Sequence, residues 1–460
     1  MAARVVDAAF ALIYLRLLGR TDVGAYQSLV VFTTYLDTLI DFGLNALLAR
    51  EVSRGSVSVS VAFRAVNRLR LGLWLIGLLP VAVIYGPLLP ATGLPSEAAA
   101  AGWIFYLALL PAVLAKTATG VLWAAERLDV TAAVSVLSTL LRTALGAVVL
   151  FGGLGLGGLG VVSLTTNVVA SVVLWRLAAT GPLATTTTEA NQPEKRATRG
   201  WLRESWPLFL NQMLQGLFFK VDAVLMPALA GSAAAGVYAA AYKVSEGAGI
   251  VSSSFTLAVF PRLARANQSA GAYAMALRLL FQIGFPLAAG IGLLAQPIVG
   301  VVGGRDYLPD SAIALAILIC YLPLSYANGL TQYVLIAAGR QRLLTGAFFA
   351  ALIFNVAANV MLIPRFSYGG AAWVTVASEV VLLVPFQLAA RKLAPQVSLT
   401  REARAPLAAT LLMAPVVWWL RDSLHPLAAA AAGAAVYALA LWALGGIDHA
   451  QRRLIAQVVR

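Results

Sequence analysis

Apolar runs of about 20 residues alternate with short polar stretches along the whole 460-residue chain. Because the hydrocarbon core of a bilayer is about 30 Å thick, a helix needs about 20 apolar residues to cross it. The pattern therefore predicts an all-α polytopic membrane protein with about fourteen transmembrane helices. The predicted spans are residues 4–18, 24–49, 69–90, 99–123, 130–151, 157–175, 206–230, 235–260, 276–302, 309–337, 343–363, 369–390, 405–420 and 425–445.

The composition agrees with this class of protein. Hydrophobic residues make up 60% of the chain and charged residues 11%, whereas a soluble domain carries about 25% charged residues. A net charge of +14 is compatible with nucleic-acid binding, but most basic residues fall in loops between spans, so we expect no nucleic-acid partner. The single cysteine and the two histidines form no metal-ligand pattern. We expect no cofactor apart from a coupling ion, H⁺ or Na⁺.

The basic residues of the loops are distributed unevenly between the two sides. The two termini and the loops after even-numbered spans hold 24 of them, Arg70 included, and the other loops hold five. Cytoplasmic loops carry an excess of Lys and Arg in membrane proteins. The distribution predicts a multi-pass protein of the cell membrane with cytoplasmic N- and C-termini.

Short motifs recur in the two halves of the chain. Gly24-Ala25-Tyr26 returns as Gly236-Val237-Tyr238, and Gly157-Gly158 as Gly369-Gly370, both 212 positions later. Six spans per repeat give both copies the same orientation, with an axis along the membrane normal and a binding site between them. The expected organisation is an N-terminal lobe (1–178), a cytoplasmic linker (179–203), a C-terminal lobe (204–392), and spans 13–14 with a cytoplasmic tail (393–460).

Four cations lie inside the apolar spans: Lys116, Arg142, Lys220 and Lys243. A Lys or Arg at mid-membrane depth costs about 2.5–3.5 kcal/mol on insertion scales, so it normally faces a wet cavity or a partner. Guanidinium does not deprotonate to escape burial, and its planar fork suits a diphosphate. We predict a cationic, anion-binding cavity formed by these four residues, and we add Arg16 at the end of the first span.

Acidic residues in the spans are candidates for ion coupling. Asp37 and Asp41 are four residues apart and share one helix face. They could bind a proton or cation, or form salt bridges with Arg142, and the sequence does not separate these alternatives. Asp222 is two residues from Lys220, which directs the two side chains to different faces.

Interhelical ion pairing is the main alternative to a role in transport. Glu246, the fourth coupling candidate, is three residues from Lys243, so the two could pair within their helix. Lys116, near the cytoplasmic end of its span, could extend its amine to the interface instead of lining the cavity. Glu379 has no partner in its own span, and we assign it no role.

Several short segments carry a resemblance to a known family. Residues 15–26, LRLLGRTDVGAY, are similar to an opening Leu-Gly-Pro-x-x-x-Gly-x-Tyr turn, with Arg20 in place of proline. Further similar segments are Asp41-Phe42-Gly43-Leu44 with Arg50-Glu51, Tyr238–Lys243, Phe260–Leu263 and Ala337–Arg340. Together they resemble the polysaccharide and oligosaccharide flippases of the multidrug/oligosaccharidyl-lipid/polysaccharide (MOP) exporter superfamily.

The resemblance implies two six-helix lobes that alternate between inward- and outward-open states around a cationic cavity. The implied substrate is a polyprenyl-diphosphate-linked glycan, with membrane lipids, a polysaccharide polymerase and glycosyltransferases as partners. Spans 13 and 14 would supply a groove for the polyprenyl tail. The alternatives are a cation-coupled multidrug exporter and a peptidoglycan-precursor (lipid II) flippase. A membrane enzyme is not expected, because no outer loop is long enough to hold catalytic groups.

Overall fold

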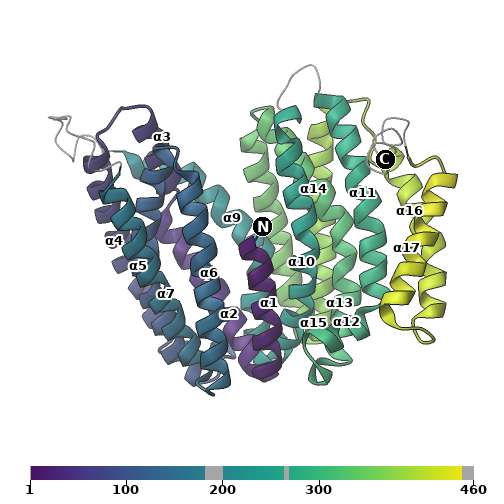
Figure 1. The fold of residues 1–460 in the computed structure, drawn as a ribbon, viewed down its shortest axis with the longest axis horizontal. Coiled ribbons are helices and arrows are strands. Elements are labelled where there is room, and N and C mark those ends of the chain that lie inside the picture. Colours follow the sequence, from purple (N-terminus) through teal and green to yellow (C-terminus); the bar gives the residue numbers. More distant parts are fainter. Residues whose placement is uncertain (1, 182–199, 264–268, 448–460) are drawn as a thin grey trace. The chain divides into compact units, whose positions relative to one another are not determined.

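The computed structural model describes residues 2–181, 200–263 and 269–447, and these residues form helices and turns without any strand (Figure 1). Helices occupy all fourteen predicted spans. Ten of the described helices are long and apolar enough to cross a membrane. One of these ten, α15, contains two predicted spans, and the more polar or shorter helices α1, α2 and α10 account for the remaining three.

The chain divides into two compact units, Met1–Ala239 and Ala240–Arg460, and each is described by itself. The first unit contains α1 (Ala2–Leu17), α2 (Arg20–Asp41), α3 (Leu44–Ser53), α4 (Val59–Ile84), η1 (Leu89–Thr92), α5 (Glu97–Ala124), α6 (Leu128–Phe151), α7 (Gly155–Ala179), α9 (Trp201–Ala230) and the start of α10 (Ser232–Leu263). Most of the predicted linker, residues 182–199, lies outside the described residues. The predicted lobe boundaries stay a prediction.

The second unit continues α10 and ends with the two helices that follow the repeat. Its other elements are α11 (Ser269–Leu293), α12 (Ala295–Val302), η2 (Arg305–Tyr307), α13 (Asp310–Leu318), η3 (Ile319–Tyr321), α14 (Leu322–Ala337), α15 (Gln341–Leu393), α16 (Leu399–Leu420) and α17 (Pro426–Ala443). α15 is interrupted at Ser367, whose φ of 50° and ψ of −134° are not helical. This break falls in the predicted loop between spans 11 and 12.

The second predicted span, 24–49, is divided by a sharp break. Phe42 and Gly43 have φ angles of 48° and 71°, so α2 ends there and α3 begins in a new direction. A Cβ on Gly43 would press on Leu208 and on the backbone of Phe209 in α9, which favours glycine at this position. The Phe42 ring stacks on that of Phe209 with the centroids 4.4 Å apart. The break therefore packs α2 against α9.

The helix of the third predicted span, 69–90, is α4. It starts ten residues before that span, at Val59, and ends before the span does, at Ile84. Its first turns are amphipathic. Phe63 and Val66 are buried, whereas Arg64 and Arg68 are exposed on another face of the helix. The arginines made this segment look like a loop in the sequence, although helical spacing of three and four residues separates the two faces.

α2 and α10 cross closely at two glycines that the sequence repeat relates. The crossing lies within the first unit, which includes α10 as far as Ala239. A Cβ on Gly24 would collide with the carbonyl oxygen of Ser232, and a Cβ on Gly236 with that of Arg20. Ser232 follows Arg20, and Gly236 follows Gly24, by the same 212 positions. The crossing is therefore reciprocal, and each helix places its own glycine against the backbone of the other.

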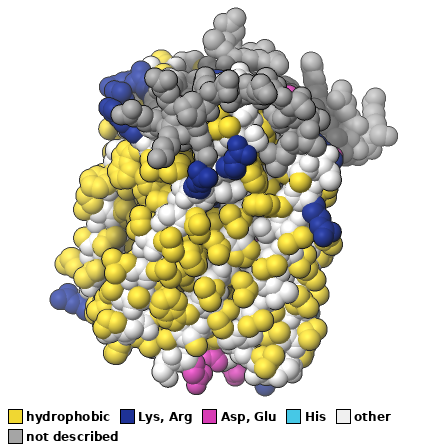
Figure 2. Space-filling model, turned by 90° about the vertical axis from the view of Figure 1, so that its left-hand side faces the viewer, with side chains coloured by type: hydrophobic (Ala, Val, Ile, Leu, Met, Phe, Trp, Pro, Cys, Tyr) yellow, Lys and Arg dark blue, Asp and Glu magenta, His cyan; other side chains and the backbone are white. Residues whose placement is uncertain are grey.

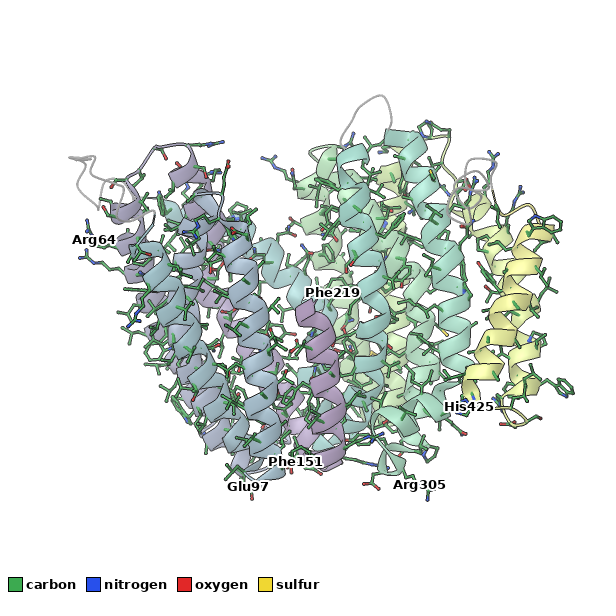
Figure 3. The ribbon with its side chains drawn as sticks, viewed as in Figure 1. Arg64, Glu97, Phe151, Phe219, Arg305 and His425 are labelled. Carbon is green, nitrogen blue, oxygen red and sulfur yellow. The ribbon has the colours of Figure 1, made fainter. Side chains whose placement is uncertain are left out.

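The surface of the first unit is mostly apolar. Figure 2 shows hydrophobic side chains over most of one face, with Lys and Arg concentrated toward one end and acidic side chains at the opposite end. Arg64 lies at one end of this unit, and Glu97 and Phe151 at the other (Figure 3). Within the second unit, Arg305 and His425 lie together at one end of that unit (Figure 3). An apolar band between polar ends is what a bilayer requires of a protein that spans it.

Candidate functional site

A buried ion pair joins α2 and α4 in the first unit. The Arg70 side chain is fully buried, and its Nη2 lies 2.5 Å from Oδ1 of Asp41. Its Nη1 donates to the Thr117 hydroxyl at 2.5 Å and to the Val113 carbonyl at 3.1 Å, both on α5. The carboxylate, the hydroxyl and the carbonyl compensate the two Nη groups of a guanidinium that has lost its contact with water, whereas the buried Nε has no hydrogen-bond partner among the described residues.

A second pair lies beside the first and is partly exposed. Nζ of Lys116 contacts Oδ2 of Asp37 at 2.5 Å, and the two side chains are 37% and 25% exposed. Asp37 and Asp41 share one face of α2, and Lys116 and Thr117 are adjacent on α5, so the two pairs form one cluster between α2, α4 and α5. The cluster contains two cations and two carboxylates and is neutral overall.

Arg142 forms a third pair, with a residue that the sequence analysis did not consider. Its Nη2 donates to Oδ1 of Asp7 on α1 at 2.7 Å. Both side chains are substantially exposed, 43% and 56%. The alternative in which Asp37 or Asp41 neutralises Arg142 does not hold, because those two carboxylates bind Lys116 and Arg70.

A polar groove of about 700 Å³ lies between α5, α6 and α7, and Arg142 is one of its lining residues. We call it the α6 groove. Six hydroxyl side chains and one amide line it: Thr119, Thr131, Ser135, Ser138, Thr139, Thr166 and Asn167. Thr131, Ser135, Ser138 and Arg142 follow one another at helical intervals of four, three and four residues, which puts them on one face of α6. This spacing was readable in the sequence, but we did not predict the groove.

The remaining predicted residues occupy other places. Lys243 and Glu246 pair across one turn of α10, with Nζ and Oε2 2.9 Å apart, as their spacing indicates. Asp222 is buried on α9 and accepts a hydrogen bond of 2.6 Å from the Tyr238 hydroxyl. Lys220 is half-buried on α9, beside the exposed Phe219 (Figure 3), and Arg16 is exposed in the last turn of α1.

Within the first unit, the predicted residues belong to more than one group of contacts. Asp37, Asp41 and Lys116 belong to the cluster between α2, α4 and α5, whereas Arg142 belongs to the α6 groove. The Lys243–Glu246 pair belongs to the second unit. A cavity shared by all of the predicted cations stays a prediction. Within the described ranges, no group of three or more His, Cys, Asp and Glu side chains could hold a metal ion.

Arg70 is the residue whose position the sequence analysis got wrong. We counted it among the basic residues of a cytoplasmic loop, and it is instead buried inside the helical bundle. The signal was present in its spacing. Arg70 lies four residues after Val66 and seven after Phe63, on the buried face of α4, whereas Arg64 and Arg68 follow the exposed face.

Glu379 has a defined environment in the second unit. It is 2% exposed, and the Asn328 amide on α14 donates to its Oε2 at 2.7 Å and to its carbonyl at 2.9 Å. On α15, Asn355 donates to the Ser378 hydroxyl at 3.0 Å. Asn359 in turn donates to Asn355 at 2.8 Å. Two buried groups of polar contacts thus lie side by side at Ser378 and Glu379, and the sequence analysis assigned Glu379 no role.

A second groove, in the second unit, is apolar. It has a volume of about 430 Å³ and lies between α11, α16 and α17, with Ile298 of α12 at its edge. Pro286, Met413 and Ala434 line it, and Tyr437 contributes the one hydroxyl among its lining residues. That hydroxyl donates to the Gln282 carbonyl at 2.7 Å and anchors α17 to α11. The groove can therefore accommodate a hydrocarbon chain without burying an unpaired polar group.

The long apolar helices define a polytopic membrane protein. The chain belongs to the polysaccharide biosynthesis protein family, whose sequence profile matches residues 1–267. No match was found among curated proteins. The resemblance inferred from the short motifs is thereby confirmed.

Solved structures support the fold across nearly the whole chain. The inward-closed structure of the lipid II flippase MurJ is 13% identical and has a TM-score of 0.75, over 95% of this chain and 96% of that one. An inward-facing multidrug resistance MATE family transporter is 15% identical, with a TM-score of 0.64 over 85% and 94%. A MOP superfamily transporter from Pyrococcus furiosus is 17% identical, with a TM-score of 0.55 over 85% and 93%. At these identities the likeness concerns the fold.

Proposed function

We propose that the protein is a flippase for a polyprenyl-diphosphate-linked oligosaccharide. It would move this lipid from the inner to the outer leaflet of the cell membrane by alternating access and so serve the assembly of a cell-surface polysaccharide. Its family membership supports the link to polysaccharide biosynthesis, and the MOP fold supports transport rather than catalysis. The glycosyltransferases that build the lipid and the polymerase that consumes it are the expected partners.

The observation that carries this proposal is the exposure and pairing of Lys116 and Arg142. Each lies within a membrane span, each is partly exposed, and each contacts a single carboxylate, Asp37 or Asp7. Ammonium and guanidinium groups have more donors than one carboxylate oxygen uses. The remaining donors are available to an anion, and a diphosphate is suited to such charge-assisted hydrogen bonds.

The same pairs provide a route to ion coupling. A diphosphate that binds Lys116 competes with Asp37, because both are anions that the same ammonium attracts. A carboxylate released from its cation binds a proton or Na⁺ more readily. Substrate binding and ion binding at Asp37 would then be linked, and the free energy of a proton or Na⁺ gradient could drive the return step. Asp41, whose partner Arg70 is fully buried, is less suited to this exchange.

The apolar groove between α11, α16 and α17 fits the polyprenyl tail in this proposal. Its lining is almost entirely apolar, and about 0.8 kcal/mol is gained for each methylene removed from water. Inside a bilayer this gain is absent, because the lipid is itself apolar, so the groove would orient the tail rather than supply affinity.

A lipid II flippase is the second candidate, and the extent of the structural likeness favours it over a multidrug exporter. The MurJ structure matches 95% of this chain, whereas three MATE transporter structures match 85–89%. A flippase with two helices beyond the twelve of a repeated bundle is consistent with this difference. The glycan carried by the lipid distinguishes the first candidate from the second.

The test is leaflet-resolved labelling of lipid-linked glycans in cells depleted of this protein. The proposal expects a polyprenyl-linked oligosaccharide to accumulate on the inner leaflet and to reappear outside when the wild-type gene is restored. Accumulation of lipid II instead would favour the second candidate. An unchanged distribution of both lipids, together with new sensitivity to cationic drugs, would contradict both and favour a multidrug exporter.

A further inference from the structure

The α6 groove is more polar than the apolar groove of the second unit. Fourteen residues line it, and six of these carry hydroxyl groups, whereas one hydroxyl lines the apolar groove of the second unit. Trp123 lies at one end of the groove, with its indole nitrogen 3.1 Å from the Thr131 hydroxyl. Arg142 lines the groove farther along α6. A pocket with a mixture of apolar walls and convergent polar groups is the usual form of a small-molecule site.

The groove extends from the end of the helices toward their middle. Leu128, the first residue of α6, and Arg142, its fifteenth, both line it. At 1.5 Å per residue, the polar face between them is about 21 Å long. Trp123 and Leu128 lie at the turn between α5 and α6, so the groove begins at that end of the unit and leads inward to the guanidinium.

The hydroxyls along this face have unused hydrogen-bonding capacity. Thr139 donates to the Ser135 carbonyl at 2.9 Å, a bond within α6 that threonines commonly form and that leaves the oxygen lone pairs available. In the described part of the chain, the side chains of Ser135 and Ser138 make no hydrogen bond at all. A hydrogen bond within α6 therefore explains the hydroxyl of Thr139, but no such bond explains the hydroxyls of Ser135 and Ser138.

A polyhydroxylated ligand matches this pattern. Each serine hydroxyl can both donate and accept, as can each hydroxyl of a sugar. The Trp123 side chain offers an apolar face with a polar edge beside them. A ligand that carries such a group next to a phosphate would have its anion at Arg142, which contributes one nitrogen to Asp7 and is 43% exposed.

We propose that the α6 groove binds the sugar next to the diphosphate of the lipid-linked substrate, with Arg142 binding the phosphate. This inference rests on the proposed function and deepens it, because it assigns glycan recognition to a site separate from the cluster between α2, α4 and α5. Ser135 and Ser138 bind the sugar hydroxyls, and Trp123 covers one face of the ring.

The test uses the full-length protein in lipid nanodiscs and two probes, a polyprenyl diphosphate without sugar and one that carries a disaccharide. The Ser135→Ala/Ser138→Ala variant should bind the glycosylated probe about tenfold more weakly, because two hydrogen bonds are lost, and the bare diphosphate unchanged. Arg142→Gln should weaken both probes. Thr165→Ala is the matched control, since Thr165 bonds to its own helix at the Val161 carbonyl and lies outside the groove.

Three results would count against the assignment in different ways. An equal loss for both probes in the serine variant, or no loss for either, would overturn the groove as a glycan site and leave the proposed function intact. A loss in Thr165→Ala as large as in the serine variant would do the same. A wild-type protein that binds neither probe would contradict the proposed function and the groove assignment together.

Discussion

Nη2 of Arg70 lies 2.5 Å from Oδ1 of Asp41, and the arginine side chain has no exposed surface. Removal of one member of a buried pair leaves an uncompensated charge, which costs about 3–5 kcal/mol, whereas replacement of both by apolar groups is often neutral. This pair and the Lys116–Asp37 pair share α2 and α5, yet they differ in exposure. Their difference in exposure allows the two pairs to be tested separately.

Arg70→Met should therefore destabilise the protein by about 3–5 kcal/mol. The double variant Arg70→Met/Asp41→Leu should be more stable than either single variant, because neither charge remains. Thermal unfolding in detergent, followed by the fraction of monodisperse protein, measures this. Arg64→Met is the control, since Arg64 is exposed on α4 and should change stability little. Additive losses in the double variant would show that the two residues do not act as a pair.

Asp37→Asn should leave folding largely intact, because Lys116 is 37% exposed and can be hydrated once it loses its partner. Flipping by this variant should stop or lose its dependence on the ion gradient. Flipping assays in proteoliposomes with an imposed proton or Na⁺ gradient measure the effect. Unchanged gradient-driven flipping in Asp37→Asn would rule out the exchange between Lys116 and a coupling ion.

Ala434→Trp should fill the apolar groove between α11, α16 and α17 and reduce labelling of the protein by a photoreactive polyprenyl phosphate by about tenfold. Ala435→Trp adds the same volume at an exposed position of α17 that does not line the groove, and should have little effect. Equal labelling of both variants and the wild type would place the prenyl tail elsewhere.

Gly24→Val should lower the yield of folded protein strongly, since even its Cβ would collide with the Ser232 carbonyl oxygen. Overpacking costs about 1–3 kcal/mol where side chains can adjust. A backbone oxygen cannot change rotamer, so the cost here should be at the upper end or higher. Gly157→Val is the control, because a Cβ on Gly157 meets no atom within 4 Å. Comparable yields for the two variants would contradict the close crossing of α2 and α10.

Reporter fusions test the predicted sidedness. Without the buried Arg70, the division of basic residues is 23 to 5, and it still predicts that a reporter within the linker 179–203 and another after Arg460 both report a cytoplasmic position. A tag at Glu97, at the opposite end of the first unit from Arg64 (Figure 3), should be accessible from outside. An external signal at either the linker or the C-terminus would reverse the orientation.

The sequence was sufficient for the number and approximate positions of the spans, because length and apolarity determine them directly, but not for the break at Phe42–Gly43 or the start of α4 at Val59. It was also sufficient for the Lys243–Glu246 pair, since three residues along a helix bring two side chains together. Pairs between helices, such as Arg142 with Asp7, depend on packing that no local spacing contains. Arg70 was misplaced because a run of arginines resembles a loop, although only Arg70 follows the buried face of α4.

The reciprocal crossing of α2 and α10 has a consequence for how such a chain can arise. Gly24 meets Ser232 and Gly236 meets Arg20, and the two contacts are equivalent, because Ser232 and Gly236 are the repeat counterparts of Arg20 and Gly24. An interface in which position i meets j while j meets i is the kind that two identical subunits form about a twofold axis. A single ancestral six-helix chain would hold both sides of this contact and could assemble with a second copy. Gene fusion would then free each glycine to change independently of the other.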